Sequence, residues 1–397
     1  MQPSTFKVIT TAFLTCLAAV LAGCSTPYSE PTFDSRPSGQ TDFAGIARLV
    51  AASPDKTLDV VLVHGMCTHA EKWAVGAITE LNDVLGGKSL PTLEKETVSG
   101  TMAVLYRSPL SAPGGTVRAT AVLWSPIFAP LKTQLCYDQT NKSETCIAAG
   151  LEQPAYPYKR ATINRILKDT LLDDCLADAI IYQGQAKKEI IQEMQLAILA
   201  AVAPGVSSVD RLAVQKAAAT QLPNLVLVTS SLGSKIAFDA IRKLIEDGDA
   251  AEKAAGLKTL DRTAQIFMQA NQLPILALGD QDLKGAAAKR AGESGAAADS
   301  LDALLKLKGP RVSAKSGKPC PMVVAFNDPS DLLSYVLTPA KQSGSYSVVD
   351  VVVSNAPTYF GLLEMPDKAH GGYAGNRRVR ELMANGHSSS GADTCGL

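Results

Sequence analysis

The apolar residues of this chain follow two patterns that alternate from about residue 55 onward. One is a short, mostly apolar run, which is typical of a strand buried on both faces of a parallel sheet. The other places apolar residues at helical spacing, as in 74–85 and 236–245, and a last helix is expected from Asn376 onward. The alternation predicts an α/β fold with a mostly parallel sheet. The expected strands are 58–63, 102–106, 120–124, 225–228, 265–268, 322–326 and 347–353.

Two long stretches depart from this alternation. Residues 131–222 are mostly helical in pattern, with the best helices at 176–182 and 190–202. The block is longer than a strand-to-strand crossover requires, so we expect a helical insertion or cap over the functional site. Residues 280–319 are rich in Ala, Gly, Ser and Lys and are expected to be a surface excursion. Both belong to one domain that we place at residues 46–397.

The N-terminal residues have the character of an export signal. Lys7 precedes an apolar segment, residues 8–21, which is shorter than a membrane-spanning helix requires. The segment ends in Leu-Ala-Gly-Cys, which resembles the lipobox of bacterial lipoproteins. The resemblance implies that residues 1–23 are removed and that Cys24 is lipidated. The alternative is an ordinary signal peptide in which Cys24 is incidental.

The residues after the lipobox refine this expectation. Ser25 follows the cysteine, and by analogy with such lipoproteins this favours the outer membrane of a bacterial cell envelope. The segment 24–45 is rich in Ser, Thr and Pro over most of its length, so we expect a flexible tether. The expected partners are therefore a membrane, through the lipid anchor, and a substrate.

Composition and charge narrow the remaining classes. The 397 residues carry 38 basic and 38 acidic side chains and no basic block, so a nucleic-acid partner is not expected. A hydrophobic content of 46% supports a substantial core. Six cysteines besides Cys24 remain after removal of the signal, and in an exported protein they suggest disulfides. The favoured pair is Cys136 with Cys146, and the pairing of Cys67, Cys175, Cys320 and Cys395 stays open.

A sharp change from strand to helix occurs around Ser231. The sequence Thr229-Ser230-Ser231-Leu232-Gly233 joins the strand 225–228 to the helix that follows. It resembles the nucleophile elbow, G-x-S-x-G, of the α/β-hydrolase superfamily, with Thr229 in place of the first glycine. A serine at such a turn projects from the strand, and the helix start behind it leaves backbone N–H groups free. The alternative is a serine-rich helix cap.

The resemblance implies a general base and an acid later in the chain, in the order Ser, Asp, His. Among four histidines, His370 lies beyond the last predicted strand and just ahead of the last helix. His387, in the polar tail, is expected to be an exposed bystander. The acid belongs in the loop after strand 322–326, where Asp331 is preferred because apolar residues follow it. Asp328, which precedes a proline, is the alternative acid.

His64, Gly65 and Met66 end the first predicted strand and resemble the H-G oxyanion loop of the same superfamily. The backbone N–H groups of Met66 and Leu232 would then form the oxyanion hole, with the His64 ring bonded to nearby backbone. A rival interpretation takes His64, Cys67 and His69 as metal ligands. A convincing fourth ligand is missing, so no metal is expected.

These residues together resemble a serine esterase or lipase-like hydrolase. The expected activity is hydrolysis of a carboxylic ester or thioester by a Ser231–His370–Asp331 triad through an acyl-enzyme, without a cofactor. Two alternatives stay open: an acyltransferase with an alcohol as acceptor, and a non-catalytic envelope lipoprotein that uses the scaffold for binding. The sequence does not identify the substrate.

Overall fold

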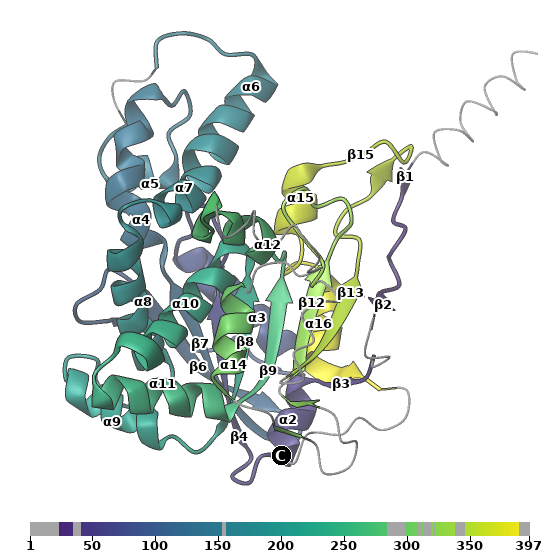
Figure 1. The fold of residues 1–397 in the computed structure, drawn as a ribbon. Coiled ribbons are helices and arrows are strands. Elements are labelled where there is room, and N and C mark those ends of the chain that lie inside the picture. The colour runs from purple at the N-terminus through teal and green to yellow at the C-terminus, as the bar shows by residue number, and fades with distance from the viewer. Residues whose placement is uncertain are drawn as a thin grey trace, which may run out of the picture.

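A nine-stranded sheet forms the centre of the computed structural model, which describes residues 24–34, 41–152, 156–283, 299–308, 311–312, 319–320, 322–337 and 346–388 (Figure 1). The strand order is β2-β13-β12-β9-β8-β4-β7-β6-β5. The strands from β13 to β7 in that order are parallel to one another. The predicted α/β fold with a mostly parallel sheet is therefore confirmed. The parallel strands are β4 (Thr57–Val63), β7 (Gly115–Leu123), β8 (Asn224–Ser230), β9 (Thr263–Gln269), β12 (Met322–Asn327) and β13 (Ser347–Val352).

Antiparallel strands close the two edges of the sheet. β6 (Val104–Ala112) forms a hairpin with β7, and β5 (Glu94–Thr97) pairs with its outer side. At the other edge, β2 (Thr32–Asp34) pairs antiparallel with β13. The apolar runs 102–106 and 120–124 mark only the halves of β6 and β7 that lie away from the turn between them. The halves next to the turn alternate polar and apolar residues, because one face of an edge hairpin meets solvent.

Helices cover both faces of the sheet. One face carries α2 (Ile46–Ala52), α3 (Glu71–Val84) and α16 (Arg377–Asn385), which share an apolar core with it. The other face carries α8 (Lys187–Ala201), α10 (Ser231–Asp247), α11 (Ala250–Arg262) and α14 (Ser300–Lys306). The sequence predicts α10 as an amphipathic helix, yet α8, α11 and α14 pack around it and bury even Lys235 and Asp239. These two polar side chains pair with each other at 3.1 Å.

The predicted helical block 131–222 divides into two parts. α8 packs on β6, β7 and α10, and α9 (Arg211–Thr220) packs on α11, so these helices belong to the layer that flanks the sheet. The remaining helices stand beyond the carboxyl ends of the parallel strands (Figure 1). We call this part the cap. It comprises α4 (Ser125–Lys132), η1 (Thr133–Asp138), α5 (Glu144–Ala148), α6 (Thr162–Ile166), η2 (Leu167–Leu176) and α7 (Ala177–Gln183).

The predicted surface excursion 280–319 returns to the core in part. α12 (Leu273–Leu276) and η3 (Ala277–Asp280) lead into it, and residues 284–298 lie outside the described residues. The helix α14 then packs on α10 with Leu301, Leu304 and Leu305 fully buried. α14 has only seven residues and follows a long Ala/Gly-rich stretch, so the sequence does not reveal it as a core helix. The short strands β10 (Arg311–Val312) and β11 (Pro319–Cys320) pair antiparallel after it.

The described residues of the predicted tether are bound to the domain. β1 (Cys24–Ser25) pairs with β14 (Thr358–Tyr359), which in turn pairs with β15 (Leu363–Glu364). β2 adds to the sheet, and β3 (Phe43–Ala44) pairs with β16 (Gly386–His387). Phe43 is buried in the core, whereas the side chains of a flexible tether would be exposed to solvent. Residues 24–34 and 41–45 therefore differ from the expected flexible chain, while 35–40 lie outside the described residues.

Two of the expected cysteines form the predicted disulfide. Cys136 and Cys146 are bonded and join η1 to α5 within the cap. Cys67 and Cys175 form a second disulfide, which links the segment after β4 to η2. Cys395 and the predicted signal segment 8–21 lie outside the described residues. Among the residues that are described, no helix is both long and apolar enough to cross a bilayer.

The carboxyl of Asp350 makes the fold sensitive to pH. Burial raises the pKa of Asp350 from 3.8 to about 7, and nearby Asp34 on β2 acts in the same direction. Between about pH 4 and pH 7 the unfolded chain therefore loses this proton before the folded chain does, so stability falls as pH rises through that window. Asn at position 350 cannot ionise, and its amide oxygen still accepts the hydrogen bonds from Asn327 and Leu337.

We therefore expect Asp350→Asn to stabilise the protein at pH 8 by roughly 2–4 kcal/mol. The gain should shrink towards zero near pH 4, as measured by urea unfolding at both pH values. The exposed helix residue Asp83, replaced by Asn, serves as the matched control and should change little. An equal gain at both pH values, or a loss at pH 8, would show that the carboxyl does not act through ionisation.

Candidate active site

Ser231 occupies the strained turn between β8 and α10. Its φ is +50°, in the left-handed region that is costly for a residue with a side chain, and α10 begins at this residue. The turn leaves no room for a side chain at Gly233 or at Gly65. A Cβ on Gly233 would lie 1.8 Å from the His64 carbonyl oxygen, and a Cβ on Gly65 would lie 2.8 Å from Ser231 Cβ. Two glycines thus let the end of β4 approach the serine.

Thr229 replaces the first glycine of the motif without disturbing the turn. The residue is fully buried, and its hydroxyl accepts a 2.9 Å hydrogen bond from the hydroxyl of Ser234 on α10. This hydrogen bond joins the end of β8 to the first turn of α10. Because Ser234 supplies a partner, the larger and polar Thr229 is accommodated where the motif has glycine.

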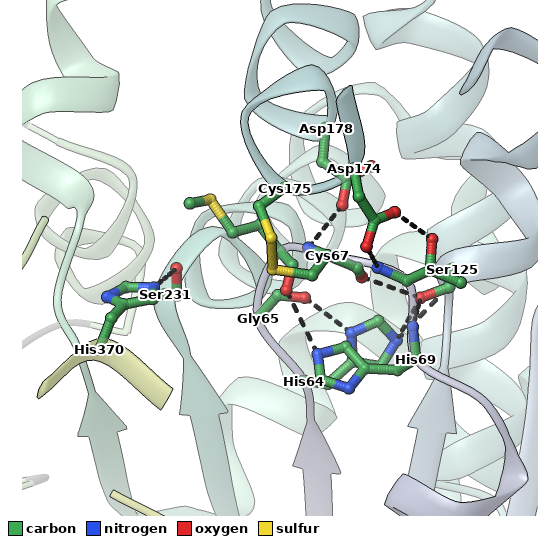
Figure 2. Close-up of a disulfide and its surroundings, with 12 residues drawn as sticks. His64, Gly65, Cys67, His69, Ser125, Asp174, Cys175, Asp178, Ser231 and His370 are labelled. Atoms are coloured by element: carbon green, nitrogen blue, oxygen red, sulfur yellow. Dashed lines mark hydrogen bonds between the residues drawn. A yellow bond between two sulfur atoms is a disulfide. The ribbon is translucent and has the colours of Figure 1, made fainter. Parts of the chain in front are cut away.

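Ser231, His370 and Asp331 form a continuous line of hydrogen bonds. Ser231 Oγ lies 3.2 Å from His370 Nε2, and Figure 2 shows the imidazole facing the serine. His370 Nδ1 lies 2.9 Å from Asp331 Oδ1 and 3.0 Å from its Oδ2. The carboxylate is fully buried while the imidazole is partly exposed. Hydrogen bonding to the carboxylate places the proton on Nδ1 and leaves Nε2 free to accept the serine proton.

The structure places Asp331, and not Asp328, behind the imidazole. Asp331 also accepts hydrogen bonds from the Tyr373 hydroxyl at 3.0 Å and from the backbone N–H of Leu333 at 3.0 Å. Asp328 points elsewhere and accepts the backbone N–H groups of Ser330 and Asn355, at 2.9 and 2.6 Å. It is a turn-forming residue, as its place before proline allows.

His370, predicted between the last strand and the last helix, lies there on a short helix of its own. The helix α15 (Pro366–Gly371) follows the β14–β15 hairpin. Asn355, after β13, donates a 2.7 Å hydrogen bond from its amide to the carbonyl of Ala369. Gly372 then lets the helix lie close, since a Cβ there would be 2.7 Å from Asn355 Cβ. Proline at the helix start, Asn355 and Gly372 together fix the position of the imidazole.

The backbone N–H groups predicted for an oxyanion hole flank Ser231. Leu232 lies in the first turn of α10, where N–H groups have no partner within the helix. Met66 follows Gly65, which lies against Ser231. The Met66 side chain is buried, with its sulfur accepting a 3.8 Å contact from the Gln272 amide. Both residues are therefore next to the serine along the chain or across the turn, as an oxyanion hole requires.

His64 acts as a structural residue, in agreement with the predicted ring-to-backbone bonding. Its Nε2 accepts the backbone N–H of Trp124 at 3.0 Å, so Nδ1 carries the proton and donates to Gly65 O at 2.7 Å. Its own carbonyl accepts the Trp124 indole N–H at 2.9 Å. Burial lowers the pKa of His64 well below its ordinary value, and burial also lowers the pKa of His69 to about 4. Both rings are neutral at pH 7.

The cap holds the segment after Met66 through several bonds (Figure 2). The Cys67–Cys175 disulfide joins it to η2. Asp178 accepts the Cys67 backbone N–H at 2.9 Å, and Asp174 accepts that of Thr68 at 3.0 Å. Lys132, with 3% of its side chain exposed, lies 2.6 Å from Asp174 and 3.1 Å from Asp178. The cap therefore fixes the loop that carries Met66.

The remaining candidates do not join this site. Cys67 is committed to a disulfide, which removes the thiolate that the rival metal interpretation requires. No group of three His, Cys, Asp or Glu residues among those described has metal-binding geometry. His387, predicted to be exposed, is half-buried on β16 and stacks on Phe33 with ring centroids 3.9 Å apart. It packs there because β3 and β16 pair.

Sequence reasoning missed the residues that support the triad. Tyr373 is three residues after His370, and its phenol is buried against Asp331. Burial raises the pKa of Tyr373 well above its ordinary value, and the charge of Asp331 acts in the same direction. That spacing is the only signal the sequence offers for it. Asp174, Asp178 and Lys132 are far from Met66 in sequence, and the cap brings them against the segment after it, at Cys67 and Thr68, so no local pattern marks them.

The Thr229–Ser234 pair yields a test of the turn. Thr229→Val keeps the shape of the side chain but leaves the buried Ser234 hydroxyl without its acceptor, so we expect a loss of about 1–3 kcal/mol in stability. The double variant Thr229→Val/Ser234→Ala removes both hydroxyls and should recover most of that loss. Urea unfolding of the two variants and of Ser234→Ala measures the coupling. Additive losses would show that the two hydroxyls do not interact.

Comparisons with known proteins leave the site to be judged by its geometry. No protein-family model matches the chain. No curated protein and no solved structure matches it with significance. The function is therefore inferred from the residues of the site and the distances between them.

Proposed function

We propose that this protein is a serine hydrolase that cleaves a carboxylic ester or thioester, on a scaffold of the α/β-hydrolase kind. The observation that carries the proposal is the hydrogen-bonded line from Ser231 through His370 to Asp331. Its serine is held at a left-handed turn between a buried strand and a buried helix. A serine, an imidazole and a buried carboxylate in this order are the parts that nucleophilic acyl transfer needs.

In the proposed first step, Ser231 Oγ attacks the substrate carbonyl carbon while His370 Nε2 takes the serine proton. Asp331 stabilises the imidazolium that forms and keeps its Nδ1 proton oriented. The N–H groups of Met66 and Leu232 donate to the negatively charged carbonyl oxygen. The tetrahedral intermediate then collapses, His370 protonates the departing alcohol or thiol, and an acyl-Ser231 ester remains.

In the second step, His370 takes a proton from water, and the resulting hydroxide attacks the acyl carbonyl. The same two N–H groups stabilise the second oxyanion. Collapse releases a carboxylic acid and returns the proton to Ser231. The protein needs no cofactor for either step, because every proton moves between Ser231, His370, water and the leaving group.

The proposed setting of this activity is the cell envelope. The signal-like N-terminus and the Leu-Ala-Gly-Cys sequence support export and attachment of lipid to Cys24, with the outer membrane as the proposed location. Two disulfides in the described chain fit an oxidising compartment. The partners under this proposal are an ester substrate and a membrane.

Replacement of the nucleophile is the first test. Ser231→Ala should lower kcat/KM for a short p-nitrophenyl ester by roughly 10³-fold or more, because the acyl-enzyme cannot form. Ser230→Ala is the matched control: its hydroxyl bonds to Gln269 and not to His370, so its activity should stay near the parent value. A Ser231→Ala protein with the parent rate would refute the proposal.

The two aspartates allow a second test of the same kinetics. Asp331→Asn should lower kcat by roughly 10²–10⁴-fold, because an amide behind Nδ1 does not stabilise the imidazolium. Asp328→Asn weakens a turn, so its main effect should be on thermal stability, with kcat changed by less than about tenfold. The reverse order of the two effects on kcat would make Asp328 the acid.

A further inference from the structure

An exposed apolar hairpin stands directly before the helix that carries His370. Its strands are β14 and β15, and the turn between them is Phe360-Gly361-Leu362. Leu362 is 87% exposed and Phe360 is 63% exposed, and Tyr359, Leu363 and Met365 are exposed as well. No polar residue interrupts this run from 359 to 363. We call residues 358–365 the apolar hairpin.

The turn of the apolar hairpin is costly for the fold. Phe360 has a φ of +52° and Gly361 a φ of +66°, and the N–H of Leu362 donates to the Tyr359 carbonyl at 2.9 Å. Exposed turns of this conformation normally use Gly, Asn or Asp, since a Phe there is strained and gains no packing. The stability of the domain therefore does not explain an aromatic residue at this position.

The proposed lipid-bearing cysteine is bonded to this same hairpin. In the β1–β14 pair, Cys24 is opposite Tyr359 and Ser25 is opposite Thr358. The Thr358 hydroxyl donates to the Ser25 carbonyl at 2.9 Å. Acyl chains attached at position 24 would therefore start beside the apolar hairpin, and not at the end of a free tether.

We propose that the apolar hairpin inserts Phe360 and Leu362 into the surface of the lipid bilayer beside the anchor at Cys24. The anchor and the hairpin then form one membrane contact with two components, in which the apolar side chains of the hairpin add to the binding that the lipid provides. The inference rests on the proposed attachment of lipid to Cys24 and does not depend on the hydrolase activity.

Membrane insertion of the apolar hairpin would orient the candidate active site. β15 continues through Met365 into α15, which carries His370. Figure 1 shows α15 and the hairpin at the same end of the molecule as α6 of the cap. That helix and the residue after it add further exposed apolar side chains, Ile163, Ile166 and Leu167. The carboxyl ends of the parallel strands, and with them Ser231, then face the bilayer.

Binding to vesicles tests the proposal without lipidation. Every described strand and helix lies between residues 24 and 388, so a chain that starts at residue 24 with Cys24→Ser keeps them all. This chain should float with phosphatidylethanolamine/phosphatidylglycerol vesicles. Phe360→Ser/Leu362→Ser should lower the vesicle partition coefficient by about tenfold or more, because the inserted apolar area is lost. Leu90→Ser/Leu222→Ser replaces two leucines that are 82% exposed and lie just before β5 and β8, away from the hairpin in the chain, and it should leave the partition coefficient unchanged.

A depth measurement provides the second readout. In the same chain, Leu362→Trp should be quenched by lipids brominated on their acyl chains, and Leu222→Trp should not. Thermal unfolding verifies that each variant is folded, which is expected because the replaced side chains are exposed.

Three results would overturn the proposal. The first is a parent chain that does not bind vesicles. The second is an equal vesicle partition coefficient for the hairpin double variant and the control double variant. The third is a Trp at position 362 that brominated lipids do not quench. The parent chain could instead form a dimer in solution and fail to bind vesicles. If Phe360→Ser/Leu362→Ser dissociates that dimer and the control substitutions do not, the hairpin is a protein interface.

Discussion

The close approach of β4 to the turn after β8 is the constraint on which the rest of the site depends. Gly65 and Gly233 remove the two side chains that would block it, and Ser231 takes a left-handed conformation in the space that remains. This contact lies at the point where the order of the parallel strands reverses: β7 is on one side of β4, and the next strand along the chain, β8, is on the other. Ligand sites of open α/β sheets occur at such points.

The segments around the turn are rigid for separate physical reasons. α10 is enclosed by three helices, so the backbone N–H groups at its start are fixed in direction. The segment after β4 is fastened to β7 by the neutral His64 ring and to the cap by a disulfide and two buried aspartates. Preorganised donors of this kind need no rearrangement when charge develops, which is why they suit acyl transfer.

The sequence predicted the features that depend on local pattern. Buried parallel strands are apolar on both faces, so β4, β8, β9, β12 and β13 were found close to their observed positions. Ser231, His370 and Asp331 were placed by motif and order along the chain, and the structure brings their side chains together. The strands of the antiparallel edge were only half recognised, since one face of each meets solvent.

Features that depend on distant pairing were missed. The segment expected to be a tether contains Phe43, yet nothing local indicates that β1, β2 and β3 have partners more than 300 residues away. The Tyr373–Asp331 bond and the Lys132–Asp174–Asp178 cluster likewise need the folded chain to meet. The strained conformation of Phe360 is visible only as a backbone angle, and it is one of the observations behind the proposed membrane contact.

The central claim is that Ser231 is an activated nucleophile. Reaction of the folded protein with a fluorophosphonate, followed by mass spectrometry of its peptides, tests this most directly because the reagent needs both the serine and the base. The account predicts one phosphonyl adduct, on Ser231, that is lost when the protein is unfolded before labelling or when His370 is replaced by Ala. A folded protein that gains no adduct, or gains it on Ser230, would contradict the account.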